Sequence, residues 1–150
     1  MTLPRRAVLA GLTGVAALTL LPRPLAAVEA APDAEEAIAA ILRGREPVEG
    51  GLVLEMPDVA ENGAQVPLTV RADSPMTPED HVTAIHLIAT RNPTPGLGRG
   101  RLTPGMGRAE FTFRVRLAED QEVLAFAETI DGRVLAAAAR VAVSVGGCAT

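Results

Sequence analysis

The feature that most constrains the fold is an alternation of apolar and polar side chains with a period of two residues. In residues 111–117, Phe, Phe, Val and Leu alternate with Thr, Arg and Arg, which is the pattern of a strand with one buried face. Residues 123–130 and 133–145 flank Asp131-Gly132, a dipeptide typical of tight hairpin turns of the primed type, and alternate residues from Leu135 to Val145 form one continuous apolar face. For most of the chain this period favours an all-β fold over a helical one.

Turn-forming residues divide this pattern into short strands at intervals of about ten residues. Strands are expected near residues 52–54, 66–72, 81–91, 97–102, 111–117, 123–130 and 133–145. In the strand at 81–91 we assign alternate residues from Val82 to Ile88 to one face, and because both faces are apolar we expect it to be covered on two sides. About seven strands, with no second helix for a crossover, predict an immunoglobulin-like antiparallel β-sandwich.

A short N-terminal helix is expected before the strands. Asp33 followed by Glu36 resembles a capping box, and residues 33–43 place their apolar side chains along one helical face, with Gly44 as the stop. Three Phe and no Trp or Tyr leave a modest core for a domain of this size. We therefore expect a partner protein to cover part of the apolar surface.

Residues 1–30 have the layout of an export signal. Arg5 and Arg6 precede residues 7–21, which are uncharged and mostly apolar but shorter than the roughly 20 residues that span a membrane. Small residues follow, and cleavage is expected after Ala27 or Ala30. The arginine pair indicates a twin-arginine-type signal peptide, with an ordinary export signal that happens to carry two arginines as the alternative. Both interpretations place the mature protein in the periplasm.

Charge and composition exclude several classes of partner. The 14 basic residues are all arginine and are outnumbered by 18 acids, and removal of the signal would make the chain more acidic. An acidic surface does not suit phosphate backbones or anionic lipid, and stacking on single strands needs aromatic side chains. We therefore expect no nucleic acid and no membrane as partner. One Cys also excludes a disulfide framework and a structural zinc site.

The titratable side chains suggest neither a catalytic site nor a metal site. His81 and His86 are five residues apart, so on a strand they are expected on opposite faces, where they could not bind one metal. The acid pairs at 79–80 and 119–120 are adjacent residues in expected loops, and we interpret them as solvating turns. No cofactor is predicted.

Glycines and arginines gather in residues 96–116. Gly96, Gly98 and Gly100 superficially resemble a phosphate loop, but no helix follows, so we interpret them as loop flexibility. The arginines either form an anion-attracting patch or simply alternate on a solvent face, and the pattern alone favours the second alternative. They are Arg99, Arg101, Arg108, Arg114 and Arg116.

The C-terminus carries the main functional signal. A sandwich domain over residues 31–145 is expected to end in a flexible arm, residues 146–150, in which Gly146 and Gly147 precede Cys148. Extended backbone would place the Cys148 thiol on the order of 10 Å beyond residue 145. The nearby terminal carboxylate disfavours the thiolate, which predicts an attachment point that is activated by another protein. An incidental tail thiol remains the alternative.

Three segments in order resemble the SoxY family, the sulfur carriers of the periplasmic thiosulfate-oxidising Sox system. Residues 57–63 with 66–67 resemble the family's early strand and turn, residues 92–96 its central loop, and residues 142–148 its cysteine arm. The resemblance covers most of the mature chain. It implies a carrier that is not itself an enzyme, with Cys148 as the covalent attachment site.

The resemblance also implies partners. In that family, a haem c-type enzyme joins thiosulfate oxidatively to the arm cysteine, a metal-dependent hydrolase releases sulfate, and a sulfur dehydrogenase acts where it is present. The carrier forms a heterodimer with SoxZ, a second β-sandwich. One departure is the end of the chain, where Ala149 and Thr150 replace the family's usual two glycines. The alternatives are a periplasmic thiol redox protein and a structural or chaperone-like sandwich with an incidental thiol.

Overall fold

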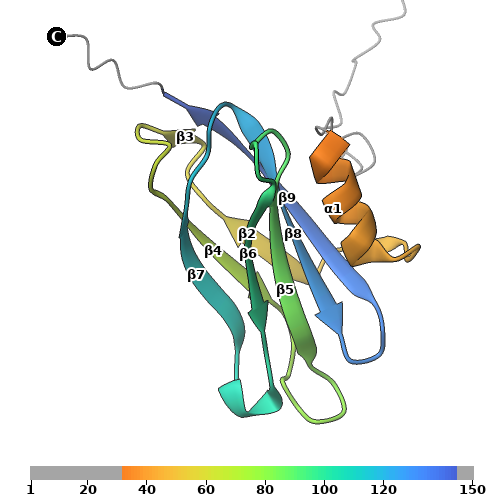
Figure 1. Ribbon diagram of the computed structural model, residues 1–150. Helices are drawn as coiled ribbons and strands as arrows, with labels where there is room; N and C mark the ends of the chain where they lie inside the picture. The colour runs from red at the N-terminus through yellow and green to blue at the C-terminus, as the bar shows by residue number, and fades with distance from the viewer. Residues whose placement is uncertain (1–31, 145–150) are drawn as a thin grey trace, which may run out of the picture.

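Strands dominate residues 32–144, the part of the chain that the computed structural model describes (Figure 1). One α-helix, α1 (Pro32–Leu42), precedes the strands, and a 3₁₀ turn, η2 (Pro104–Met106), lies between two of them. The strands in chain order are β1 (Pro47–Glu49), β2 (Leu52–Glu55), β3 (Val59–Ala60), β4 (Val66–Ala72), β5 (Val82–Ala89), β6 (Gly96–Arg101), β7 (Ala109–Val115), β8 (Gln121–Thr129) and β9 (Val134–Val143).

These strands form two sheets that face each other. The larger sheet has the order β1-β9-β8-β5-β6, with β3 also paired to β9, and the smaller has the order β2-β4-β7. All pairings are antiparallel except those of β1 and β3 with β9, which are parallel. The predicted β-sandwich is confirmed, and each of the seven expected strands is present. The strands β1 and β3, with 3 and 2 residues, are too short to show a period.

The main core lies between the two sheets. Its fully buried side chains include Leu68 and Val70 of β4, Leu87 of β5 and Val123 of β8. Val82 also enters this core, contrary to its predicted place on the other face of β5. The reason is a β-bulge between Val82 and Ala84, because one extra residue reverses the alternation of faces.

A second apolar cluster lies on the outer face of the larger sheet, under α1. Ala34 and Ile41 of the helix pack on side chains of β5, β8 and β9, which are Ile88, Leu124, Phe126, Val134 and Ala136. This packing is why β5 is apolar on both faces, as predicted. The helix begins at Pro32, a favoured first residue, and ends before Arg43 and Gly44, which have φ angles of 50° and 78°.

Gly96, Gly98 and Gly100 lie in the strand β6, so their interpretation as loop flexibility was wrong. A Cβ atom on Gly98 would lie 3.4 Å from the Phe113 ring, and one on Gly100 would lie 2.2 Å from the Phe111 ring. A side chain at position 100 would overlap the Phe111 ring, whereas one at position 98 would only reach contact distance from Phe113. Gly100 therefore allows the edge of the larger sheet to lie directly on β7.

The β8–β9 hairpin forms as predicted, but its turn is longer than a two-residue primed turn. Thr129 N–H donates to Arg133 O (3.0 Å), which leaves three residues in the loop, and Gly132 has a φ of 90°. This geometry corresponds to a type I turn followed by a left-handed glycine. Ile130 N–H donates instead to His81 O (2.9 Å), so the neighbouring strand holds Ile130 out of the hairpin ladder.

Candidate functional site at the end of strand β9

The predicted attachment site, Cys148, lies outside the described residues, as do Gly146, Gly147 and the twin-arginine pair Arg5-Arg6. The structure describes the chain up to Ser144, four residues before the cysteine. Residues 141–144, here called the arm root, therefore fix where the predicted arm begins. The geometry that holds this root is the part of the candidate site that the structure describes.

Strand β3 holds the arm root on one side. It pairs in parallel with the end of β9, with Ala60 beside Val143. Ala142 N–H donates to Asp58 O (2.8 Å), and Ser144 N–H donates to Ala60 O (2.9 Å). The early segment at 57–63 thus contains a two-residue strand that holds β9 as far as its last residue, Val143, and also holds Ser144.

Asp120 holds the arm root on the other side. The β8–β9 ladder begins at the pair Gln121 and Val141, so β8 has no backbone left to pair with Val143. The Asp120 Oδ1 atom takes its place and accepts a hydrogen bond from Val143 N–H (2.7 Å). The sequence analysis treated this acid as a turn-solvating residue and missed its contact, since no local pattern links it to a strand more than 20 residues later.

Gly63 closes the space beneath the arm root. Its carbonyl accepts a hydrogen bond from Leu117 N–H (2.7 Å). A Cβ atom at this position would lie 2.4 Å from Leu117 O and 2.8 Å from Val143 Cγ1. A larger residue would therefore displace either the loop after β7 or the root itself.

Asn92, from the central loop, fixes the segment that carries Asp120. Its Nδ2 group donates to Arg116 O (2.7 Å), and its Oδ1 atom accepts from Ala118 N–H (3.0 Å) and Gln121 Nε2 (2.9 Å). The early segment thus pairs directly with the arm root, whereas the central loop is linked to the root indirectly, through residues 116–121. They lie at the end of the sandwich where β9 ends (Figure 1).

An open cleft of about 420 Å³ lies beside the Asn92 loop. It is lined by Asn92, Pro93, Thr94, Gly96, Leu97, Arg116 and Ala118. Arg116 carries the one formal charge in this lining, so the cleft contains no pair of groups for acid–base chemistry.

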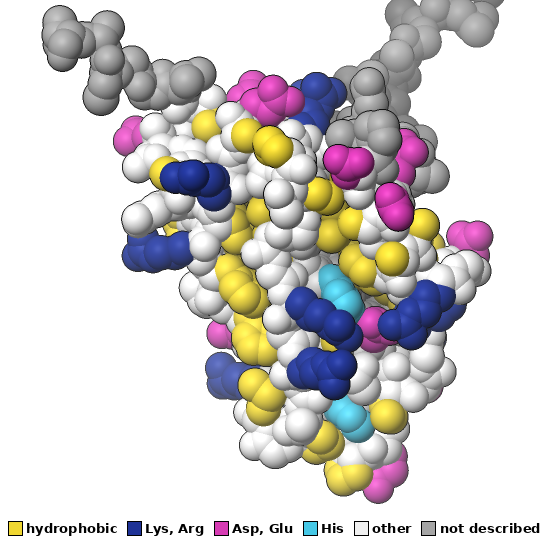
Figure 2. Space-filling view, in the orientation of Figure 1, with side chains coloured by type: hydrophobic (Ala, Val, Ile, Leu, Met, Phe, Trp, Pro, Cys, Tyr) yellow, Lys and Arg dark blue, Asp and Glu magenta, His cyan; other side chains and the backbone are white. Residues whose placement is uncertain are grey.

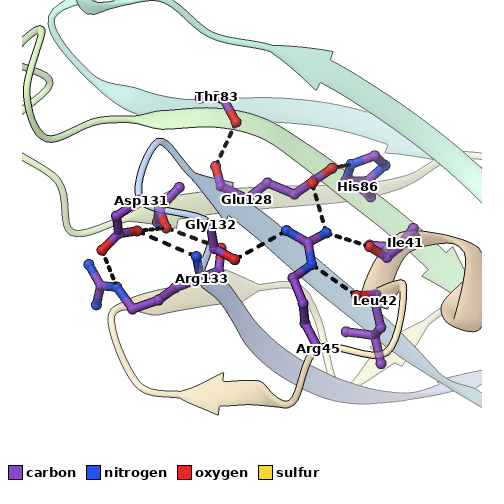
Figure 3. Close-up of polar contacts among 10 residues, drawn as sticks. Ile41, Leu42, Arg45, Thr83, His86, Glu128, Asp131, Gly132 and Arg133 are labelled. Atoms are coloured by element: carbon purple, nitrogen blue, oxygen red, sulfur yellow. Dashed lines mark hydrogen bonds and ion pairs between the residues drawn. The ribbon is translucent and has the colours of Figure 1, made fainter.

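A second polar cluster lies elsewhere, at the start of β9 (Figure 3). Glu128 accepts hydrogen bonds from His86 Nε2 (2.8 Å) and Arg45 Nη2 (2.9 Å). Arg45 also donates to Ile41 O, Leu42 O and Gly132 O. The guanidinium thus ties the last carbonyls of α1 to the β8–β9 hairpin.

The charge of Glu128 fits this structural role. Burial raises the pKa of its carboxyl, but the hydrogen bonds from Arg45 and His86 and their charges outweigh burial, so the pKa is lowered from its ordinary value. An ionised Glu128 only accepts, so the Nε2 atom of His86 carries a proton. Every buried side-chain N or O atom in residues 32–144 has a hydrogen-bond partner, which indicates a satisfied structural cluster.

The prediction that His81 and His86 lie on opposite faces was wrong. The bulge that turns Val82 into the core shifts the alternation, and both histidines are visible on the same face in Figure 2. They still have separate partners, since His81 Nδ1 lies 2.9 Å from Thr77 O. Over residues 32–144 no three His, Cys, Asp or Glu side chains are grouped to hold a metal.

Within the described range, no helix has both the length and the apolar character needed to cross a membrane.

The sequence of residues 38–148 matches the family described as "Sulfur oxidation protein SoxY". The chain belongs to the SoxY family. The match includes the whole arm root and ends on Cys148. A search of curated protein sequences found no match.

Solved structures agree with the SoxY family assignment. The sulfur carrier protein SoxY from Chlorobium limicola f thiosulfatophilum is 27% identical, with a TM-score of 0.62 over 74% of this chain and 96% of that one. The superoxide reductase (neelaredoxin) from Ignicoccus hospitalis is 18% identical, with a TM-score of 0.57 over 63% of this chain and 80% of that one. A putative superoxide reductase from Thermotoga maritima is 18% identical, with a TM-score of 0.53 over 66% and 88% of the two chains. The two reductases share the fold alone.

Proposed function

We propose that this SoxY-family protein carries sulfur intermediates of thiosulfate oxidation on the Cys148 thiol, in a periplasmic complex with a SoxZ-like subunit. The observation that carries the proposal is the arm root. Strand β9 is held by β3 and Asp120 up to Ser144, and the chain then continues as Val-Gly-Gly-Cys. A firmly held root followed by glycines suits a thiol that must reach sites on other proteins.

The carrier cycle needs two steps at the thiol. In the first, the Cys148 thiolate and thiosulfate form an S–S bond, giving Cys–S–S–SO₃⁻, and two electrons pass to a haem c-type enzyme. In the second, a hydrolase adds water to the terminal sulfur, which releases sulfate and two protons and leaves Cys–S–S⁻. A sulfur dehydrogenase, where present, oxidises the remaining sulfur.

The protein's own contribution is presentation of the thiol. Extended backbone from residue 145 carries Cys148 on the order of 10 Å from the body, and two glycines leave a narrow neck for entry into an enzyme pocket. In this proposal the partner enzyme supplies the activation of the thiol. This division of labour is why we propose a carrier and not an enzyme.

The SoxZ-like subunit is proposed to cover apolar surface beside the arm root. Val59 of β3 is 59% exposed although its strand pairs directly with the root. An apolar side chain in this position is suited to contact with a second sandwich. Export of the pair through the twin-arginine route would require the signal in residues 1–30.

The test is intact-mass analysis of the mature protein after incubation with thiosulfate and the matching periplasmic enzymes. We expect the C-terminal peptide to gain one thiosulfate unit and then to lose sulfate when the hydrolase is added. Cys148→Ser is the matched control and should stay unmodified while folding normally. An unmodified C-terminal peptide in the presence of active enzymes would contradict the proposal.

A further inference from the structure

One side of the sandwich is open. The strand β6 ends the larger sheet and β7 ends the smaller one, and in residues 32–144 neither pairs with a strand on its outer side. The ring contacts of Gly98 and Gly100 show that the two free edges lie against each other. We call this surface, residues 96–101 and 109–115, the β6/β7 side. An edge strand presents unpaired backbone N–H and C=O groups to whatever lies beside it.

Aromatic side chains fill the seam between the two edges. Phe111 and Phe113 have ring centroids 5.7 Å apart and are two of the three Phe in the chain. They are only partly buried, as is Leu97 beside them. The backbone of β6 lies against the rings at Gly98 and Gly100, but because both rings are only partly buried, some aromatic surface stays accessible. In protein interfaces such surface acts as an anchor when polar groups surround it.

Arginines flank this seam on both sides. The five that the sequence analysis noted are all exposed, and none has an ion-pair partner within the described residues. The side chains of Arg99 and Arg101 project from the outer face of β6, and that of Arg114 projects from the outer face of β7. Arg108 and Arg116 lie just beyond the two ends of β7. Figure 2 shows apolar side chains on this face with arginine groups on both sides of them.

The positive charge is local, since the chain as a whole is acidic. Residues 81–118 contain six arginines and one acid, Glu110, and Glu110 already lies 3.9 Å from Arg71. Arginines on an edge strand commonly prevent sheet-to-sheet aggregation. Charged side chains of either sign can prevent aggregation. That role therefore does not explain why positive charges alone are concentrated around exposed aromatic rings on an acidic protein.

We propose that the β6/β7 side is a docking surface for a partner protein that presents acidic side chains on an extended segment. Free strand edges would pair with that segment, Phe111 and Phe113 would anchor it, and the flanking arginines would select and attract its carboxylates. The surface shares no residue with the arm root and does not include Cys148. The inference therefore stands independently of which sulfur species the thiol carries.

The test compares two double variants with the same change in net charge. Arg99→Glu with Arg114→Glu reverses charge on both sides of Phe113. Arg43→Glu with Arg140→Glu reverses two exposed arginines that lie away from the seam and have no ion pair in residues 32–144. The Gln versions of both pairs provide milder changes. Equal thermal unfolding temperatures would show that each variant folds.

The probes are the purified SoxZ-like subunit, the thiosulfate-conjugating enzyme and the sulfate-releasing hydrolase, titrated calorimetrically into the mature protein. We expect at least one of them to bind the seam variant at least about tenfold more weakly, with a smaller difference at high salt. The control variant and Cys148→Ser should bind like the wild type, and bound partner should slow hydrogen exchange in β6 and β7.

Three outcomes would overturn the inference. All probes could bind the seam variant as tightly as the wild type. Self-association of the wild type, abolished in the seam variant, would instead assign the surface to a second copy of this chain. Binding to phosphatidylglycerol vesicles in place of every protein probe would assign it to a membrane. Because Cys148→Ser retains the docking surface, failure of the carrier proposal would leave this result unaffected.

Discussion

At the scale of single residues, the arm root depends on a side chain that acts in place of a strand. Asp120 accepts from Val143 N–H where the β8 backbone no longer pairs with β9. An exposed hydrogen bond of this kind contributes about 1 kcal/mol to stability. Its larger effect is positional, because it fixes the direction in which the chain leaves the sandwich.

We expect Asp120→Ala to loosen the end of β9 while the rest of the sandwich stays folded. Hydrogen exchange at Val143 should accelerate, with a loss of about 1 kcal/mol in the free energy of unfolding. Asp120→Asn keeps an accepting oxygen and should restore most of the protection. Glu119→Ala removes the neighbouring acid, which pairs only weakly with exposed Arg91 (4.0 Å), and should leave Val143 protected. Equal exchange rates in the two Ala variants would contradict this role.

Asp131 gives the molecule a defined response to acid. Hydrogen bonds from Thr129 Oγ1 and from Arg133 lower the pKa of its carboxyl to about 2, from an ordinary value of 3.8. A folded-state pKa below the unfolded value stabilises the fold at pH above the unfolded pKa, and this contribution is lost as pH falls towards the folded pKa. The relevant window therefore runs from about pH 4 to pH 2.

Asp131→Asn should remove this part of the acid dependence. Thermal unfolding followed between pH 6 and pH 2 should show a less stable variant at pH 6 that converges with the wild type towards pH 2. Glu46→Gln, at an exposed position just before β1, should keep the wild-type profile. A constant difference between Asp131→Asn and the wild type down to pH 2 would exclude the carboxyl as the cause.

At the scale of secondary-structure elements, α1 is joined to the sheet by apolar packing and by one polar cluster. Arg45 donates to two carbonyls at the end of the helix and to Glu128 on β8. The side chains of Glu128 and His86 are 12% and 11% exposed, so water does not readily replace a lost partner. The cluster fixes the helix end against the β8–β9 hairpin (Figure 3).

Glu128→Gln should release this end of the helix. The amide still accepts one hydrogen bond but lacks the charge that Arg45 and His86 face, so we expect a loss of about 2 kcal/mol in the free energy of unfolding and faster hydrogen exchange in α1. Glu55→Gln breaks an exposed 3.5 Å pair with Arg71 and should cost less than about 1 kcal/mol. Similar losses in the two variants would argue against a special role for the Glu128 cluster.

Sequence periodicity could predict only the elements that are long enough to show several repeats of the strand period. The expected strand at 66–72 coincides with β4. The apolar character of both faces of β5 correctly predicted that other elements cover this strand on both sides. The strand β3 could not be recognised as a strand, since two residues show no period and its pairing to β9 depends on tertiary structure. The β5 bulge and the β6 glycines were missed for a related reason. Both are responses to a neighbouring strand that the local sequence does not reveal.

At the scale of the whole molecule, β9 separates two tasks. Its first residues pair with β1 and β8, near the polar cluster that fixes the end of α1. Its last residues pair with β3, and Val143 N–H donates to Asp120. The sequence predicted the carrier thiol from Gly-Gly-Cys at the chain end but could not predict what holds the root. That support comes from residues 58–63, 92 and 120, which are distant in sequence and converge only in the folded chain.

This separation predicts that the proposed arm can be stiffened without weakening the body. Gly146→Pro with Gly147→Pro changes residues that follow the last strand pairing found in residues 32–144, so we expect the thermal unfolding temperature to match that of the wild type. Proline fixes φ near −65°, which should restrict the directions in which Cys148 can point. We therefore expect thiosulfate loading and sulfate release by the partner enzymes to fall at least about tenfold, because misplacement of a reacting group by a small distance is costly.

A matched pair of variants distinguishes stiffness from simple loss of glycine. Gly146→Ala with Gly147→Ala retains more backbone freedom than the proline pair and should show an intermediate rate. Small-molecule alkylation of Cys148 should proceed equally in all three proteins, since a free reagent does not depend on the direction of the arm. If the proline pair were loaded by the enzymes at the wild-type rate, the arm would not need flexibility. If it unfolded at a lower temperature, residues 146–147 would belong to the folded body instead.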